Sequence, residues 1–178
     1  MAVAARLALR EKAPVDVGGT IAGNDAPLLQ VEPGYRNVLR VRSLILWGTL
    51  TVGALFFDRL IFDGATLWLP PLLFAVLGLL AVVVLPERTY RRLRYRLTGR
   101  LLQVMRGWLV HSDTVVPLVR VQHLDVVRGP LEKMFGTATL VVHTAGTINS
   151  TVTVPGLAPD RAAEIRDVIR EHVRTDYE

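Results

Sequence analysis

The residues best suited to proton transfer in this chain are His123 and Asp125, which one residue separates. Side chains two apart on a strand share a face, so this carboxylate could orient the imidazole as a general base. Such a base needs a nucleophile or a metal, but the 178 residues include no cysteine, no serine in a nucleophile motif and no paired histidine spacing typical of zinc. The sequence therefore indicates no catalytic, cofactor-binding or metal-binding residue, and we expect surface or hydrogen-bonded histidines at His111, His123, His143 and His172.

A second group of side chains is basic and contributes to the net charge of +5. The segment from Arg88 to Arg106 contains seven arginines and no acidic residue. Near a membrane, each such arginine can attract anionic lipid headgroups by roughly 1 kcal/mol. The alternative is that the cluster only sets the orientation of the preceding helices. Nucleic acid is a less expected partner, because DNA binding needs an exposed groove-reading element, whereas this cluster lies within a few residues of the expected bilayer. The lipid hypothesis assigns headgroup contacts to Arg91, Arg92, Arg94 and Arg96.

The arginines follow two long apolar segments. Residues 64–85 contain no charge, and residues 43–57 are also uncharged. About 20 apolar residues suit a bilayer core, whereas a helix of a soluble protein needs a polar face. A soluble protein with a two-helix core is therefore the weaker reading of this pattern. The sequence predicts two transmembrane helices, at about 41–62 and 67–85, joined by a short turn.

Flanking charges predict the orientation of this hairpin. Three arginines precede the first helix and five follow the second, whereas the turn carries Arg59 beside two aspartates. Cytoplasmic flanks are enriched in Lys and Arg, so both termini are expected in the cytoplasm. Arg59 can extend to the opposite interface. Close approach of the two helices could rely on Gly48, Gly53 and Gly78.

The rest of the chain divides into a tail and a small domain. Residues 1–34 contain too many Gly and Pro residues for a long regular element, apart from a short helix at 4–12. We expect a flexible cytoplasmic tail that becomes ordered near Tyr35. The hairpin then occupies residues 35–86 and the cytoplasmic domain residues 87–178.

Alternating apolar residues predict an antiparallel sheet or barrel in the domain. In its first strand, Leu93, Tyr95 and Leu97 share the core face, and Arg92, Arg94 and Arg96 the other face. After a turn at 155–157, an amphipathic helix starting at Pro159 closes the domain, with Ala162, Ile165, Ile169 and Val173 on its apolar face. The expected strands are 92–97, 101–105 with a continuation at 108–111, 113–117, 121–127, 138–144 and 151–154, with a short helix or turn at 131–136.

Two stretches carry a family resemblance. The run VVPLVRVQHLDV (115–126) is followed by GPLEKMFGTATL (129–140), and then by HTAG (143–146) and PGL (155–157). With two transmembrane helices before it, this series resembles the YdbS-like family of bacterial PH-domain membrane proteins over about 33–173. The resemblance implies an α+β membrane protein of the bacterial inner membrane, with a pleckstrin-homology-like (PH-like) cytoplasmic domain capped by a C-terminal helix. The positions that carry it are Pro117, Arg120, Gln122, Gly129, Phe135, Gly136 and Gly146.

These positions look mainly architectural, since Gly and Pro set turns and Phe135 is expected in the core. Arg120 and Gln122 could form either a buried polar pair or an interface. The expected function is non-enzymatic: an interaction or scaffold module in a homo- or hetero-oligomer with related PH-domain membrane proteins, in contact with the bilayer and its anionic headgroups. One alternative is a lipid-sensing or regulatory module in envelope stress or antimicrobial-peptide tolerance. Another is an accessory subunit of a transporter or membrane enzyme.

Overall fold

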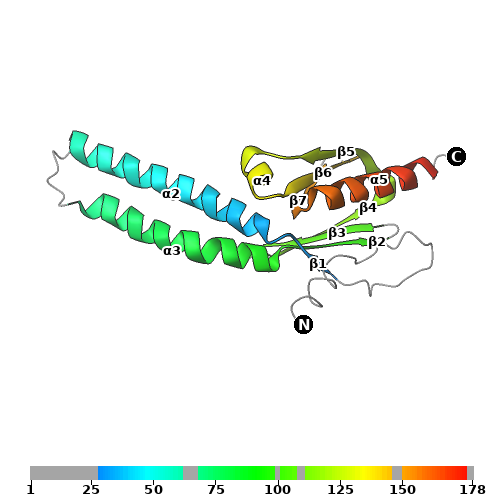
Figure 1. Cartoon of the computed structure of the whole chain (residues 1–178), viewed down its shortest axis with the longest axis horizontal. Helices are drawn as coiled ribbons and strands as arrows, with labels where there is room; N and C mark the ends of the chain where they lie inside the picture. Colours follow the sequence, from blue (N-terminus) through cyan, green and yellow to red (C-terminus); the bar gives the residue numbers. More distant parts are fainter. Residues whose placement is uncertain (1–27, 62–67, 99–100, 108–110, 146–149, 176–178) are drawn as a thin grey trace.

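The computed structural model describes residues 28–61, 68–98, 101–107, 111–145 and 150–175. Two long helices, α2 (Gly34–Ile61) and α3 (Leu69–Arg92), lie side by side along the longest axis (Figure 1). A domain of strands and shorter helices lies at one end of this hairpin, where α2 begins and α3 ends. The described part of the chain therefore has the predicted order of hairpin, strands and C-terminal helix.

The domain contains two antiparallel sheets, with strand orders β1-β2-β3-β4 and β5-β6-β7. A short 3-10 helix, η1 (Leu118–Arg120), connects the last strand of the first sheet to the first strand of the second. Helix α4 (Pro130–Met134) lies between β5 and β6, and α5 (Pro159–Thr175) follows β7. The strands are β1 (Leu29–Gln30), β2 (Arg94–Thr98), β3 (Leu101–Arg106), β4 (Ser112–Pro117), β5 (Val121–Val127), β6 (Ala138–Thr144) and β7 (Thr151–Leu157).

Alternation along the strands places one face of each sheet in a common core. Leu102 and Val104 of the first sheet and Leu140 and Val142 of the second are all 0% exposed. Helix α5 closes this core, and its buried residues are Ala162, Ile165 and Ile169, whereas the side chain of Val173 lies outside the described residues. The amphipathic pattern therefore predicted correctly which described face of α5 is buried.

Contacts between polar groups join the layers around this core. Arg106 of β3 donates hydrogen bonds to the hydroxyl and the carbonyl oxygen of Thr153 in β7, which links the two sheets. The guanidinium of Arg161 in α5 donates a hydrogen bond to the hydroxyl oxygen of Tyr95 in β2. Burial raises the pKa of the Tyr95 hydroxyl, and the hydrogen bond from the guanidinium partly offsets that rise.

The N-terminal boundary differs from the prediction. Leu29 and Gln30 form β1 and pair with Tyr95 and Arg94, so the chain is ordered before Tyr35. Val31 is 2% exposed and joins the domain core. The physical reason is that an apolar segment can cover the edge of β2 and bury its own side chains there. The rest of the expected tail, residues 1–27, lies outside the described residues.

The boundary between hairpin and domain is also different. Helix α3 continues to Arg92 instead of ending near residue 85, because Tyr90 and Leu93 are buried in the domain core. The first turns of α2 contribute Tyr35 and Val38 to the same core. Residues on both sides of the predicted boundary at 86/87 therefore share one core.

The strand predictions need two further corrections. Arg92 lies in the last turn of α3, so it is not on β2 with Arg94 and Arg96. Strand β7 continues through the expected turn to Leu157, because Gly156 adopts a positive φ of 76° and a register shift accommodates the extra residues. The expected helix at 4–12 and residues 108–110 of the expected strand continuation lie outside the described residues.

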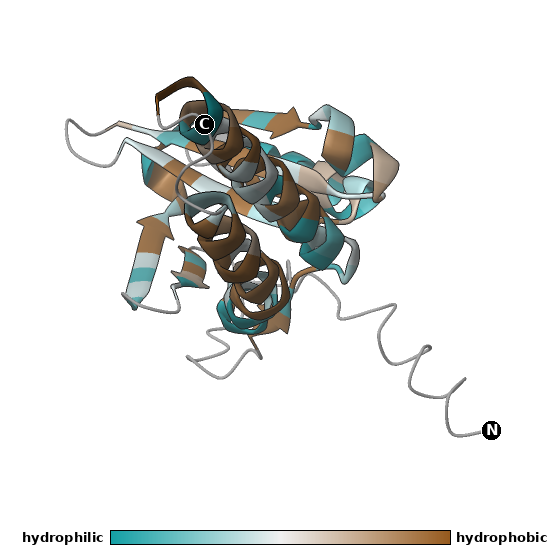
Figure 2. Cartoon of the chain, turned by 90° about the vertical axis from the view of Figure 1, so that its left-hand side faces the viewer, coloured by the Kyte–Doolittle hydropathy of each residue, from teal (hydrophilic) through white to brown (hydrophobic). Residues whose placement is uncertain are grey.

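The outer part of the hairpin consists mostly of hydrophobic residues (Figure 2), and we call their exposed side chains the apolar belt. On α2 this belt runs from Leu44 to Ile61, and on α3 from Leu69 to Val84. At 1.5 Å per residue, these segments measure about 24–27 Å, close to the thickness of a bilayer core. Because these side chains face outward, a bilayer explains them better than the core of a soluble protein.

The two helices approach closely at one of the three glycines named above. A Cβ atom on Gly78 would lie 2.8 Å from Cβ of Trp47, so Trp47 packs directly against the α3 backbone. Added Cβ atoms on Gly48 and Gly53 would meet nothing within 4 Å. Only Gly78 of these three therefore serves the predicted packing role within the hairpin.

Candidate functional site

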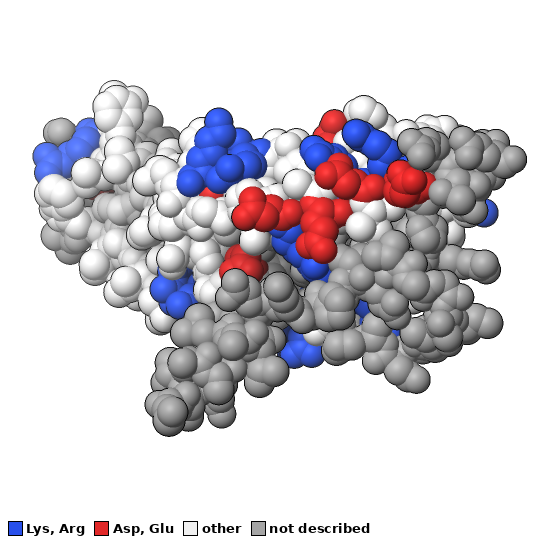
Figure 3. Space-filling view, turned by 45° about the vertical axis from the view of Figure 1, so that its right-hand side comes forward, with Lys and Arg blue, Asp and Glu red and all other residues white. Residues whose placement is uncertain are grey.

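Charged side chains are concentrated where the hairpin enters the domain and on the domain itself. In Figure 3 a band of uncharged surface separates a basic group at the far end of the hairpin from the charged groups over the domain. At the far end, the guanidinium of Arg59 lies 4.4 Å from the ring centre of Trp68. At the domain end, Glu87 of α3 joins the helices, because its carboxylate lies 3.4 Å from Arg36 Nη1 of α2 and 2.7 Å from Arg91 Nε.

The four arginines of the lipid hypothesis do not form one row. Arg91 and Arg92 end α3, whereas Arg94 and Arg96 lie on the outer face of β2, opposite Met105 and Gln103. The side-chain period changes from helix to strand at Leu93, which separates the two pairs. Arg94 is exposed, but Arg96 is half-buried and has a buried Nε atom. Lipid contact at these four positions stays a prediction.

Three of the seven family-resemblance positions, Pro117, Gly129 and Gly136, lie at the ends of elements or in a turn. Pro117 ends β4 and precedes η1, and Gly129 precedes α4. Gly136 has a φ of 64°, a conformation that glycine adopts most readily. Gly146 lies outside the described residues.

Phe135 is half-buried at the edge of the core, so the prediction of a buried side chain was too strong. The reason is its position at the end of α4, on the rim of the domain. Its carbonyl oxygen packs against Gly34, where an added Cβ atom would collide with it. Phe135 therefore has two contacts: its backbone packs against α2, and its ring packs against the edge of the core.

Sequence reasoning missed Glu132, a carboxylate that is only 6% exposed. Its Oε2 accepts a hydrogen bond of 2.7 Å from the backbone N–H of Gly129, and its Oε1 accepts one of 2.7 Å from Oγ1 of Thr139. The signal was present in the sequence, because a glutamate at the third helical position often bonds back to the residue before the helix. Glu132 fixes α4 to the start of β6.

Arg120 and Gln122 are both exposed, so the buried polar pair is ruled out. Nearby in the sequence, Val115 and Val119 are 50% and 64% exposed. We call the segment from Val115 to Gln122 the signature segment, because it lies within the first stretch of the family resemblance. The exposed valines, arginine and amide of this segment therefore lie on the surface of the domain and not in its core.

The histidine and aspartate singled out in the sequence do lie together, on the outer face of the second sheet. His123 Nε2 is 3.0 Å and His143 Nε2 is 3.7 Å from the carboxylate oxygens of Asp125. Thr151 Oγ1 lies 3.2 Å from His143 Nδ1. All three titratable side chains are at least 41% exposed. Within the described part of the chain, no group of three His, Cys, Asp or Glu residues is arranged to hold a metal ion.

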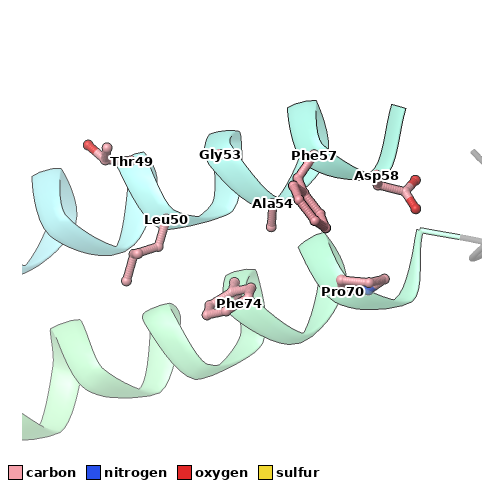
Figure 4. Close-up of a pocket in the computed structure, with 8 residues that line it drawn as sticks. All are labelled: Thr49, Leu50, Gly53, Ala54, Phe57, Asp58, Pro70 and Phe74. Carbon is pink, nitrogen blue, oxygen red and sulfur yellow. The ribbon is translucent and has the colours of Figure 1, made fainter. Parts of the chain in front are cut away.

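A groove of about 400 Å³ lies between the two helices, inside the apolar belt. Figure 4 shows Phe57 and Phe74 projecting into the space between the helices. The lining is mostly apolar and comes from the parts of α2 and α3 that carry the apolar belt. The lining residues are Thr49, Leu50, Gly53, Ala54, Phe57, Asp58, Pro70 and Phe74.

The chain has a membrane hairpin that continues into a domain of two sheets and a closing helix. This arrangement places it in the class of membrane-anchored PH-like proteins. The chain belongs to the YdbS-like bacterial PH-domain family, because the family model for the bacterial PH domain matches residues 43–173. The transmembrane protein YdbS of Bacillus subtilis is 34% identical over 110 residues, which cover 60% of this chain and 67% of that protein. No solved structure matches the chain. The protein is therefore a transmembrane protein with a bacterial PH domain.

Proposed function

We propose that this protein is a non-enzymatic scaffold that binds a second membrane protein through the signature segment of its PH-like domain. The partner is another copy of this chain or a related PH-domain membrane protein. The observation that carries the proposal is the exposure of this segment, which presents two valines and the polar side chains of Arg120 and Gln122.

The neighbouring strand supports a protein partner. Among the described strands, β4 pairs only with β3, which leaves its other edge open. An open strand edge exposes unpaired N–H and C=O groups that another chain can bind. Next to this edge, Leu101 is 39% exposed and pairs with Pro117 of β4. The apolar side chains and the strand edge together favour a protein surface over a small molecule.

Continuity between helices and domain supports the scaffold role. Because the first turns of α2 and the last turn of α3 contribute side chains to the domain core, the domain is held in a fixed orientation to the hairpin. A partner bound at the signature segment would then be held at a defined height above the membrane. Such a role needs no catalytic residue.

Substitution of Val115 tests this proposal. Two differently tagged copies of the full chain, or one copy and a related PH-domain membrane protein, are co-expressed and purified together in mild detergent. We expect Val115→Asp to reduce the amount of co-purified partner about tenfold or more, because a charge in the centre of an apolar contact is costly to desolvate.

Val127→Asp is the matched control, since Val127 is 49% exposed against 50% for Val115 and lies at the far end of β5. This variant should retain the partner. Equal loss in both variants would show a general effect on the fold, and unchanged co-purification of Val115→Asp would refute the proposed surface.

We also infer an inner-membrane location with both termini in the cytoplasm. The support is the set of arginines at the domain end of the hairpin, namely Arg36, Arg40 and Arg42 on α2 and Arg88, Arg91 and Arg92 on α3. Topology reporters fused after Glu178 and inserted at residues 63–65 should score as cytoplasmic and external, respectively. An external score at the C-terminus would reverse this orientation.

A further inference from the structure

Helix α4 occupies the end of the domain that faces the apolar belt. In Figure 1 it lies beside the first turns of α2, on the side from which the two long helices extend. Contact is direct, because the carbonyl oxygen of Phe135, just after α4, packs against Gly34. The remaining described elements of the domain, apart from the ends attached to the helices, extend away from the hairpin.

The exposed face of α4 combines an apolar side chain with positive charge. Met134 is 75% exposed, a larger fraction than for any other large apolar side chain in the described residues, those of the apolar belt included. Lys133 beside it is exposed, and so is Arg128 just before the helix. Glu132 points inward and uses both carboxylate oxygens in hydrogen bonds. The outward face therefore carries no acidic side chain of α4.

The position of α4 along α2 brings this face near the bilayer surface. Helix α4 contacts the first turns of α2, where the carbonyl oxygen of Phe135 meets Gly34, and α2 continues from there to Arg42. The apolar belt begins at Leu44, two residues later, or about 3 Å further along the helix axis. The headgroup layer on each side of the bilayer core is about 5–8 Å thick. Arg42 therefore lies within that layer.

We propose that α4 rests on the cytoplasmic lipid surface, with Met134 at the boundary between headgroups and acyl chains and Lys133 and Arg128 against anionic headgroups. Two observations favour lipid as the occupant: the site adjoins the apolar belt, and its charge is opposite to that of anionic lipids. One methionine and two cations bind weakly on their own. The hairpin overcomes this weakness, because it holds α4 at the surface at a high effective concentration.

This contact differs from the arginine hypothesis, which uses the end of α3 and the outer face of β2. It also does not depend on a protein partner. If the scaffold proposal fails, α4 can still contact lipid, and if α4 does not contact lipid, the signature segment can still bind a protein.

The chain contains no cysteine, so a single cysteine can be labelled without removing native residues. Met134→Cys in the full chain carries a polarity-sensitive fluorophore, and the protein is reconstituted at one copy per nanodisc. Nanodiscs contain phosphatidylcholine alone or with phosphatidylglycerol, each with a fraction of headgroup spin-labelled lipid. Val119→Cys is the matched control, because Val119 is 64% exposed and lies in η1, between β4 and β5, and not in α4.

We expect the label at residue 134 to be quenched several-fold more strongly than the label at 119, and more strongly with phosphatidylglycerol. Adding Lys133→Glu should remove most of the extra quenching due to the anionic lipid. Equal quenching of the two labels, or no response to either lipid, would overturn the proposal. If the label at residue 134 is shielded from water only when several copies share a nanodisc, α4 contacts another protein copy and not lipid, which would overturn the proposal.

Discussion

Gly156→Ala should destabilise the domain by about 2–5 kcal/mol, the sum of backbone strain and steric overlap. Gly156 has a φ of 76°, and an L side chain in that region costs about 1–2 kcal/mol. In addition, an added Cβ atom would lie 2.6 Å from Cγ of Tyr35. Overpacking of this kind costs about 1–3 kcal/mol. The Tyr35 ring cannot move freely, because it is part of the domain core.

Gly136→Ala is the control for this prediction. Gly136 also has a positive φ, 64°, but a Cβ atom there would meet nothing within 4 Å. Its expected cost is therefore only the strain, about 1–2 kcal/mol. Urea denaturation of the full chain in detergent, followed by near-UV circular dichroism, measures both variants. Equal losses would show that the contact between β7 and the first turn of α2 does not contribute to stability.

Glu132→Ala should have an effect of similar size, about 2–5 kcal/mol, because it leaves two partly buried donors without an acceptor and empties a buried position. These donors are the backbone N–H of Gly129 and the hydroxyl of Thr139. Glu132→Gln keeps one acceptor oxygen, so it should lower the free energy of unfolding by about half as much as Glu132→Ala. The same denaturation measurement applies.

Glu164→Ala is the comparison for a surface carboxylate. Glu164 pairs with Arg161 at 2.7 Å, but its side chain is 49% exposed. Exposed ion pairs contribute about 0–1 kcal/mol, so a small change is expected. If Glu132→Ala and Glu164→Ala lost the same stability, the hydrogen bonds that hold α4 to β6 would be unimportant.

Several features were predictable from the sequence because they depend on neighbouring residues only. The uncharged runs predicted the hairpin, and strand-forming runs, β-branched in 138–144, predicted β5 and β6 with their observed limits. The helical period predicted α5 from Pro159 onward. The resemblance to YdbS-like proteins rested on turn residues such as Gly129 and Pro117, and the family match confirms it. Glu132 was within reach of the same reasoning, since its spacing from Gly129 is a known helix-start pattern.

The sequence pattern did not predict whether particular side chains are buried or exposed. The pattern around Phe135 is apolar, yet the ring is only half-buried, because α4 lies on the rim of the domain. Arg120 and Gln122 were left open between core and surface, and their exposure depends on how η1 directs the chain between the two sheets. The prediction that Arg92, Arg94 and Arg96 share one face of a strand was wrong, because α3 continues through Arg92.

The sequence by itself determined the membrane hairpin, the described strands from β3 to β6, the apolar face of α5 and the family, because hydropathy and periodicity are local properties of the chain. Only the tertiary structure decided that β1 joins the first sheet, that Tyr35 packs on Gly156 and that Glu87 joins the two helices. These contacts connect residues more than 50 positions apart. These contacts form only when the chain folds, so a pattern of neighbouring residues does not predict them. The packing of Tyr35 on Gly156 joins the first turn of α2 to the domain.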